Sequence, residues 1–181
     1  IMKNNSGAQK FSGNNTYTGG TRLQAGTMVL GGDNVLGTGL LEWTGNGSVS
    51  ADATPRTLTN NIRVSPINNI TMGLAGAART TLSGNVDLGG GGNATITVNS
   101  DVVLNGSTIG NGEIKSKAGA GTLTLQGIAG EMTGALNQTV QDGALVLDGA
   151  RLTNTATGFF VQSVVSNGTA RLVLTNNATL A

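Results

Sequence analysis

The sequence contains neither histidine nor cysteine, and this double absence removes most familiar catalytic centres. Histidine is the usual general base and the most frequent metal ligand, so serine–histidine–aspartate and cysteine–histidine constellations are excluded. Without cysteine there are no disulfides and no thiolate metal sites. Carboxylates remain available for acid–base chemistry. We expect no catalytic site, no cofactor and no bound metal.

Charged and aromatic residues are also scarce, at 10% and 3% of the chain. The formal net charge of +1 lacks the strong basic field of a nucleic-acid binder, so we expect no nucleic-acid partner. No apolar run approaches the roughly 20 residues of a membrane-spanning helix, and residues 1–10 lack the apolar core of a signal peptide. We therefore expect no membrane insertion by this segment, and any export to occur as part of a longer precursor.

What the chain has in abundance is glycine, 30 residues of it, between short runs rich in Leu, Val and Ile. Apolar and polar residues alternate in ATITV (94–98), TLTL (122–125), ALVLDG (144–149) and ARLVLT (170–175). This period of two predicts strands with one buried face. Gly-Gly, Asn-Gly and Asn-Asn pairs between the runs tolerate the positive φ angles of tight turns. The chain is therefore predicted to be all-β.

A long internal repeat organises these strands. GAQKFSG (7–13) aligns with GTLTLQG (121–127), and QAGTMVLGG (24–32) aligns with QDGALVLDG (141–149). The offset grows from 114 to 117 residues, and the three extra residues fall in the turn between the aligned segments. Insertions confined to turns are typical of stacked repeats.

The repeat divides a single segment, residues 1–181, into three parts. They are a first copy (1–114), the start of a second copy (115–149) and less regular coils (150–181).

Three pieces of the chain carry a family resemblance. NTYTGGTRLQAGTMVLGG (15–32), LTNNI (58–62) and GNGEIKSKAGAGTLTLQG (110–127) closely resemble the autotransporter-associated β-strand repeat. That motif occurs in passenger regions of bacterial type V secretion proteins and in very large bacterial surface proteins. The sequence departs from it where AQKF (8–11) replaces the usual TLTL, and where the second copy lacks the NTYTGGT element. The resemblance implies a right-handed parallel β-helix that is exposed outside the cell.

Physical considerations favour the same architecture. At roughly 20–25 residues per coil and about 4.8 Å between paired strands, the chain makes about eight coils and a rod of about 40 Å. The matched repeat positions predict that Val29 and Val146 point outward and that six side chains point inward: Met28, Leu30, Leu123, Leu125, Leu145 and Leu147. An antiparallel sandwich also fits short strands with regular turns, but it does not account for the long repeat.

Two classes of function fit a β-helix of this composition. The first is a structural or adhesive segment of a bacterial surface protein, such as a passenger stalk or fibre unit. The second is a β-helix that binds or degrades polysaccharides through carboxylates, and stacking of coils makes Glu131 and Asp148 the best candidate pair. The uniformly short connections favour the first class.

Four residues are candidates for glycan contact. Trp43 and Tyr17 are the only Trp and Tyr in the chain and have rings suited to stacking on a sugar. Lys115 and Lys117 alternate along one strand, which suits an anionic glycan. The expected partners are therefore surface glycans or receptors, neighbouring repeats, and other copies of the chain that pair head to tail through open β-helix ends.

Overall fold

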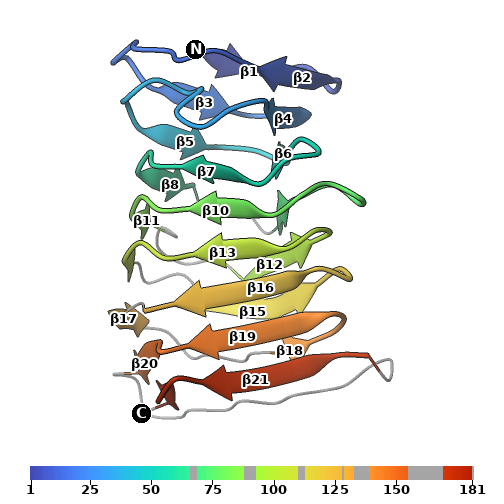
Figure 1. Ribbon diagram of the computed structural model, residues 1–181, viewed down its shortest axis with the longest axis vertical. Helices are drawn as coiled ribbons and strands as arrows, with labels where there is room; N and C mark the ends of the chain where they lie inside the picture. Colours follow the sequence, from blue (N-terminus) through green and yellow to red (C-terminus); the bar gives the residue numbers. More distant parts are fainter. Residues whose placement is uncertain are drawn as a thin grey trace.

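The structure is a computed structural model, and the residues it describes are 1–65, 69–87, 93–109, 113–127, 129–132, 139–154 and 169–180. Within these residues the chain forms strands and turns and no helix. The strands stack in successive coils along one axis, with the N-terminus at one end and the C-terminus at the other (Figure 1). Every strand pairing described is parallel.

The strands form three faces along the coils. Face 1 is a six-stranded sheet in the order β1 (Met2–Lys3), β3 (Thr21–Leu23), β5 (Leu41–Trp43), β8 (Ile62–Val64), β11 (Val86–Asp87) and β14 (Thr108–Ile109). Packing of β17 beside β14 continues this face into a three-stranded sheet of β17 (Ala129–Met132), β20 (Arg151–Asn154) and β22 (Thr179–Leu180).

Faces 2 and 3 follow in chain order after face 1 in most coils. Face 2 has seven strands, β2 (Ala8–Phe11), β4 (Thr27–Leu30), β6 (Ser48–Ala51), β9 (Asn69–Met72), β12 (Asn93–Val98), β15 (Glu113–Ala118) and β18 (Thr139–Val140). Face 3 has six strands, β7 (Arg56–Leu58), β10 (Thr80–Leu82), β13 (Val102–Leu104), β16 (Thr122–Gln126), β19 (Ala144–Asp148) and β21 (Arg171–Thr175).

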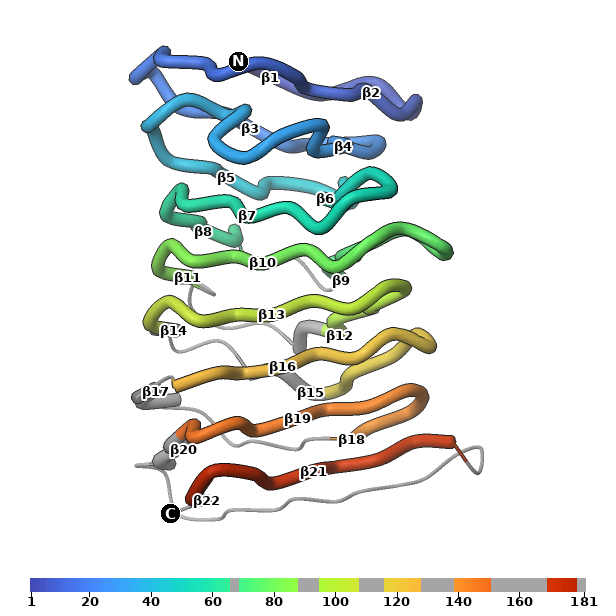
Figure 2. The backbone as a smooth tube through the Cα atoms, viewed as in Figure 1, coloured from blue at the N-terminus to red at the C-terminus, as the bar shows by residue number. Residues whose placement is uncertain are grey.

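This arrangement is a parallel β-solenoid, which confirms the predicted fold class and rejects the antiparallel sandwich. Leu41 pairs with Ile62, 21 residues later, and Ile62 pairs in register with Val86, 24 residues later. Figure 2 shows the backbone returning to the same face after each such interval. Face 2, the largest single sheet, contains seven strands, so the number of described coils differs slightly from the eight that were predicted. The right-handed sense stays a prediction.

The interior is filled by side chains that stack in register from one coil to the next. All six leucine and methionine positions predicted to point inward are buried, whereas Val29 and Val146 between them are partly exposed. Leu123, for example, pairs with Val102 on one side and Leu145 on the other. These aliphatic ladders place the core along the axis, and the period-two prediction for these strands is confirmed.

The two repeat copies have the same local geometry on different faces. In the first copy β2 pairs with β4 on face 2, whereas in the second the equivalent β16 pairs with β19 on face 3. Strand β14 lies five coils after β1 on face 1. The strand that corresponds to β1 in the second copy is β15, which follows β14 in the chain and lies on face 2. One repeat therefore advances the chain by five coils and one face.

Candidate functional surfaces

Trp43 lies in the core and not on the surface. Its exposed fraction is 0%, and its indole Nε1 donates a hydrogen bond of 3.2 Å to the carbonyl oxygen of Gly47. On the inward ladder of face 1 it pairs with Leu23 and Val64. A buried ring has no face to offer a sugar, so the prediction that Trp43 contacts a glycan is wrong.

Lys117 is buried as well, with an exposed fraction of 0%. Ala94 pairs with Ile114 and Thr95 with Ser116, so Lys115 is the extra residue of a β-bulge. The bulge changes the alternation of β15 and leaves Ser116 and Lys117 buried side by side in sequence. The prediction of two lysines on one outward face is therefore wrong for Lys117, and the side chain of Lys115 lies outside the described part of the chain.

Tyr17 is the one aromatic glycan candidate near the surface, and it is half-buried. Its hydroxyl is 2.7 Å from the hydroxyl of Thr21. Its ring packs over Gly37, where an added Cβ would lie 2.9 Å from Cδ2 of the ring. The backbone amide of Thr38 donates a hydrogen bond of 3.0 Å to the Tyr17 carbonyl. The NTYTGGT element thus holds the connection between β2 and β3 against the next coil.

A polar cleft of about 390 Å³ lies beside this element and spans three coils. Its lining contains no titratable side chain and consists of Asn14, Asn15, Thr16, Asn34, Gly37, Thr38, Thr59, Asn60 and Asn61. The buried amide of Asn60, from the LTNNI piece, donates to the carbonyl oxygens of Leu36, Gly37 and Gly39 at 3.3, 3.1 and 2.7 Å. Such a surface suits a neutral hydroxylated ligand and no charged one.

The predicted carboxylate pair is not brought together by strand stacking. Glu131 lies in β17 and pairs in register with Thr153, whereas Asp148 lies in β19 and pairs with Gln126 and Thr175. Hydrogen bonds from Asn176, Gln126 and Thr175 hold the pKa of Asp148 below its ordinary value. A general acid needs a raised pKa, so Asp148 is tuned away from that role.

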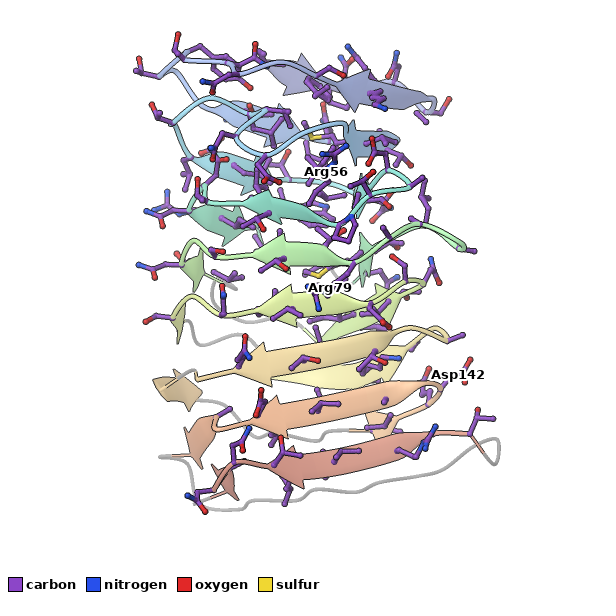
Figure 3. All side chains as sticks on the ribbon, viewed as in Figure 1. Arg56, Arg79 and Asp142 are labelled. Atoms are coloured by element: carbon purple, nitrogen blue, oxygen red, sulfur yellow. The ribbon has the colours of Figure 1, made fainter. Side chains whose placement is uncertain are left out.

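Asp52 is the centre of a surface ion cluster. Its carboxylate accepts hydrogen bonds from Nε and Nη2 of Arg56 at 3.0 Å each, and Nζ of Lys10 lies 2.9 Å from Oδ2. These contacts lower the pKa of Asp52 far below its ordinary value, with Arg56 the largest cause. Arg56 is seen on β7 in Figure 3, and its amide bonds to the carbonyl of Arg79 one coil further on. The cluster links neighbouring coils, and its ionised carboxylate is not suited to general acid–base catalysis.

A ladder of alternating charge runs along the outer side of face 1. Glu42 pairs in register with Arg22 on one side and Arg63 on the other, and Arg63 pairs with Asp87. The Arg22–Glu42 and Arg63–Asp87 pairs are 2.8 Å and 3.5 Å apart. We call these four residues the charge ladder. It continues without interruption through four coils.

The charge ladder and the burial of the equivalent lysines Lys3 and Lys117 were not predicted from the sequence, although the sequence contains a signal for each. The charge ladder residues are spaced at 20, 21 and 24 residues, which is the coil length, and each lies in a short strand. Lys3 and Lys117 are 114 residues apart, which is the offset of the first aligned pair in the repeat. Lys3 is buried too, at 2% exposure.

Within the described residues, no group of three or more acidic side chains is placed to hold a metal ion. The same part of the chain contains no helix long and apolar enough to cross a membrane.

Comparison with known proteins gives one family. The model of the passenger-associated-transport-repeat matches residues 2–34 and again residues 116–147. These two matches contain the segments that align within the sequence, and they confirm the predicted resemblance to the autotransporter-associated repeat. No curated protein matches the chain, and no solved structure does.

Proposed function

We propose that this chain is a non-catalytic structural segment of an exported bacterial surface protein, and that it serves as a stiff stalk. The observation that carries the proposal is the in-register stacking of parallel strands along three faces. Each interior strand is hydrogen-bonded on both sides, so bending requires many backbone hydrogen bonds to break together. A passive spacer needs this geometry and no chemical site.

Export to the cell surface is the second part of the proposal. It is supported by the two matches to a repeat whose name associates it with passenger transport. The low charge and the glycine-rich turns fit a solenoid that folds by adding coils to a growing end.

The stiffness of the stalk can be measured directly, because a chain without cysteine accepts unique labels. Thr57 and Val173 are both partly exposed and are linked by five strand spacings along face 3, or about 24 Å. Spin labels on Thr57→Cys and Val173→Cys should give a single narrow distance near this value. A matched pair, Thr57→Cys with Val146→Cys, should give about 19 Å. Broad distributions in both pairs would contradict a stiff stalk.

Absence of catalysis is tested separately. We expect no release of reducing sugar from neutral or acidic polysaccharides. Turnover that disappears in Glu131→Ala or Asp148→Ala would instead favour the polysaccharide-processing alternative.

Adhesion is a second candidate function, favoured by the polar cleft. Its uncharged amides and hydroxyls suit a neutral glycan, and the half-buried ring of Tyr17 lies at its edge over Gly37. On a glycan array we expect any binding to be lost in Asn14→Trp, which fills the cleft, and retained in Asn46→Trp, at an exposed position outside it. Binding that survives both changes would exclude the cleft.

Pairing with other copies or with neighbouring repeats is the partner relationship we propose. Parallel strands at the edge of a coil present unpaired N–H and C=O groups that another coil can extend. Light scattering over a range of concentrations should show growing species. A strict monomer at high concentration would leave only the monomeric stalk.

A further inference from the structure

Two buried lysines occupy positions that belong to the apolar core. Lys3 pairs in register with Leu23 on face 1, and Lys117 pairs with Ile96 and Val140 on face 2. Their exposed fractions are 2% and 0%. A buried ammonium is costly unless its N–H groups are all hydrogen-bonded. Each of these side chains therefore requires acceptors in the interior.

The acceptors are almost entirely backbone carbonyls. Nζ of Lys117 donates to the carbonyl oxygens of Gly119 at 2.5 Å, Asp142 at 2.7 Å and Gly121. The Lys117 site joins two consecutive coils, because Gly119 and Gly121 follow in its own coil and Asp142 lies one coil further on, at the turn before β19 (Figure 3).

Lys3 has the same arrangement. Its Nζ donates to the carbonyl oxygen and the side-chain oxygen of Asn5, both at 2.5 Å, and to the carbonyl oxygen of Ala25 at 3.1 Å. No carboxylate accepts a hydrogen bond from either described ammonium group.

The two sites are related by the internal repeat. Lys3 and Asn5 align with Lys117 and Gly119, and Ala25 aligns with Asp142. The backbone follows the same path, because the amides of Gln24 and Gln141 donate to the carbonyls of Lys3 and Lys117 at 2.8 and 2.9 Å.

A glycine one coil later completes each site. Gly26 and Gly143 align with each other and have φ angles of 72° and 63°. A Cβ at these positions would lie 2.3 Å from Nζ of Lys3 and 2.5 Å from Nζ of Lys117. Only a residue without a side chain leaves room for the ammonium group. Both matches to the passenger-associated-transport-repeat begin within one residue of the lysine.

We propose that each repeat copy contains a carbonyl-lined site that is specific for a primary ammonium group, which the chain fills with its own lysine to fasten one coil to the next. Three N–H donors match three oxygen acceptors from two coils. Methionine fills the volume without donors, and the planar guanidinium of arginine does not fit behind the glycine. This inference concerns stability of the coil and does not depend on the stalk function.

Chemical rescue tests the site. Lys117→Ala removes the groups beyond Cβ, which correspond to n-propylammonium. Because three carbonyls lose their donors, we expect the melting temperature to fall by about 5 to 10 °C. Added n-propylammonium should recover part of this loss in the variant and leave the unmodified chain unchanged. Equal recovery with n-propanol would show that only volume matters and would overturn the proposal, as would an unchanged melting temperature.

Four further variants serve as controls and as a second route. Lys10→Ala removes a largely exposed lysine that pairs with Asp52; it should lower the melting temperature less than Lys117→Ala does and show no rescue by n-propylammonium. If Lys117→Ala does not fold, Lys3→Ala provides the equivalent test nearer the end of the stack. Gly143→Ala should lower the melting temperature more than Gly127→Ala, which has nearly the same φ, 61°, but open space around the added Cβ. Equal decreases in melting temperature for the two variants would contradict the proposal that Gly143 makes room for the ammonium group.

Discussion

Asp52 and Arg56 form a bidentate ion pair at the start of face 3, with both hydrogen bonds 3.0 Å long. The Arg56 guanidinium, assisted by Lys10, lowers the pKa of Asp52 below its ordinary value of 3.8. A lowered folded-state pKa contributes stability that is present above pH 3.8 and is lost as the pH falls further. The cluster therefore stabilises the fold at neutral pH and weakens it in acid.

Replacement of Asp52 by Asn should flatten this acid dependence. We expect the urea midpoint of Asp52→Asn to be lower than that of the unmodified chain at pH 6 and to converge with it as the pH falls well below 3.8. The measurement is a series of urea titrations from pH 6 to pH 2. Parallel curves across the whole range would show that this carboxylate is not coupled to folding.

Lys117 predicts a pH dependence of the same sign at the alkaline end. Burial lowers its pKa from 10.5 to about 8, against the opposing influence of Asp142 and Asp101. Between these two values the unfolded chain binds more protons, so this group makes the free energy of unfolding rise with pH. The difference between the unmodified chain and Lys117→Met, followed from pH 7 to pH 11, should show the rise. Lys10→Met should retain it.

Trp43 offers a single optical probe of the core. Because the ring is fully buried, we expect a blue-shifted emission that acrylamide quenches poorly, and a red shift on unfolding. Trp43→Ala should cost about 3 to 5 kcal/mol of stability because it leaves a large cavity. Tyr17→Phe, which loses only the hydrogen bond to Thr21, should cost about 1 kcal/mol. Strong quenching in the native state would mean that the core is open at this coil.

The charge ladder predicts a salt-sensitive contribution. Glu42→Arg places three positive charges on adjacent coils and should lower the free energy of unfolding by about 1 kcal/mol at low ionic strength. High salt should reduce this difference, because the side chains are partly exposed to solvent. Glu42→Gln is the neutral control and should show a smaller change. A salt-independent loss would point to packing instead of charge.

The architecture was predictable because its signal is periodic and local. Strands such as β16 and β19 alternate strictly, and inward leucines such as Leu123 and Leu145 lie at matched repeat positions. Neither requires knowledge of a distant contact. Because the same alternation of inward apolar and outward polar residues recurs along the chain, the fold class can be predicted from the sequence.

The individual site residues were harder to predict, because they depend on departures from that rule. A single bulge at Lys115 moves Lys117 from the expected outer face to the interior. The burial of Trp43 depends on which side of a three-residue strand it occupies, and so short a strand carries little alternation. The sequence therefore predicted the strands of the solenoid better than it predicted which individual side chains point inward or outward.

The advance of five coils and one face per repeat has a consequence for any longer array of such repeats. Equivalent features of successive copies point in directions that differ by about a third of a turn around the axis. The matched surfaces then follow a screw, and only every third copy presents the same side to a neighbour. A stalk built from such repeats favours no single direction around its axis. It can therefore display the same surface all around its circumference without any twist of the underlying strands.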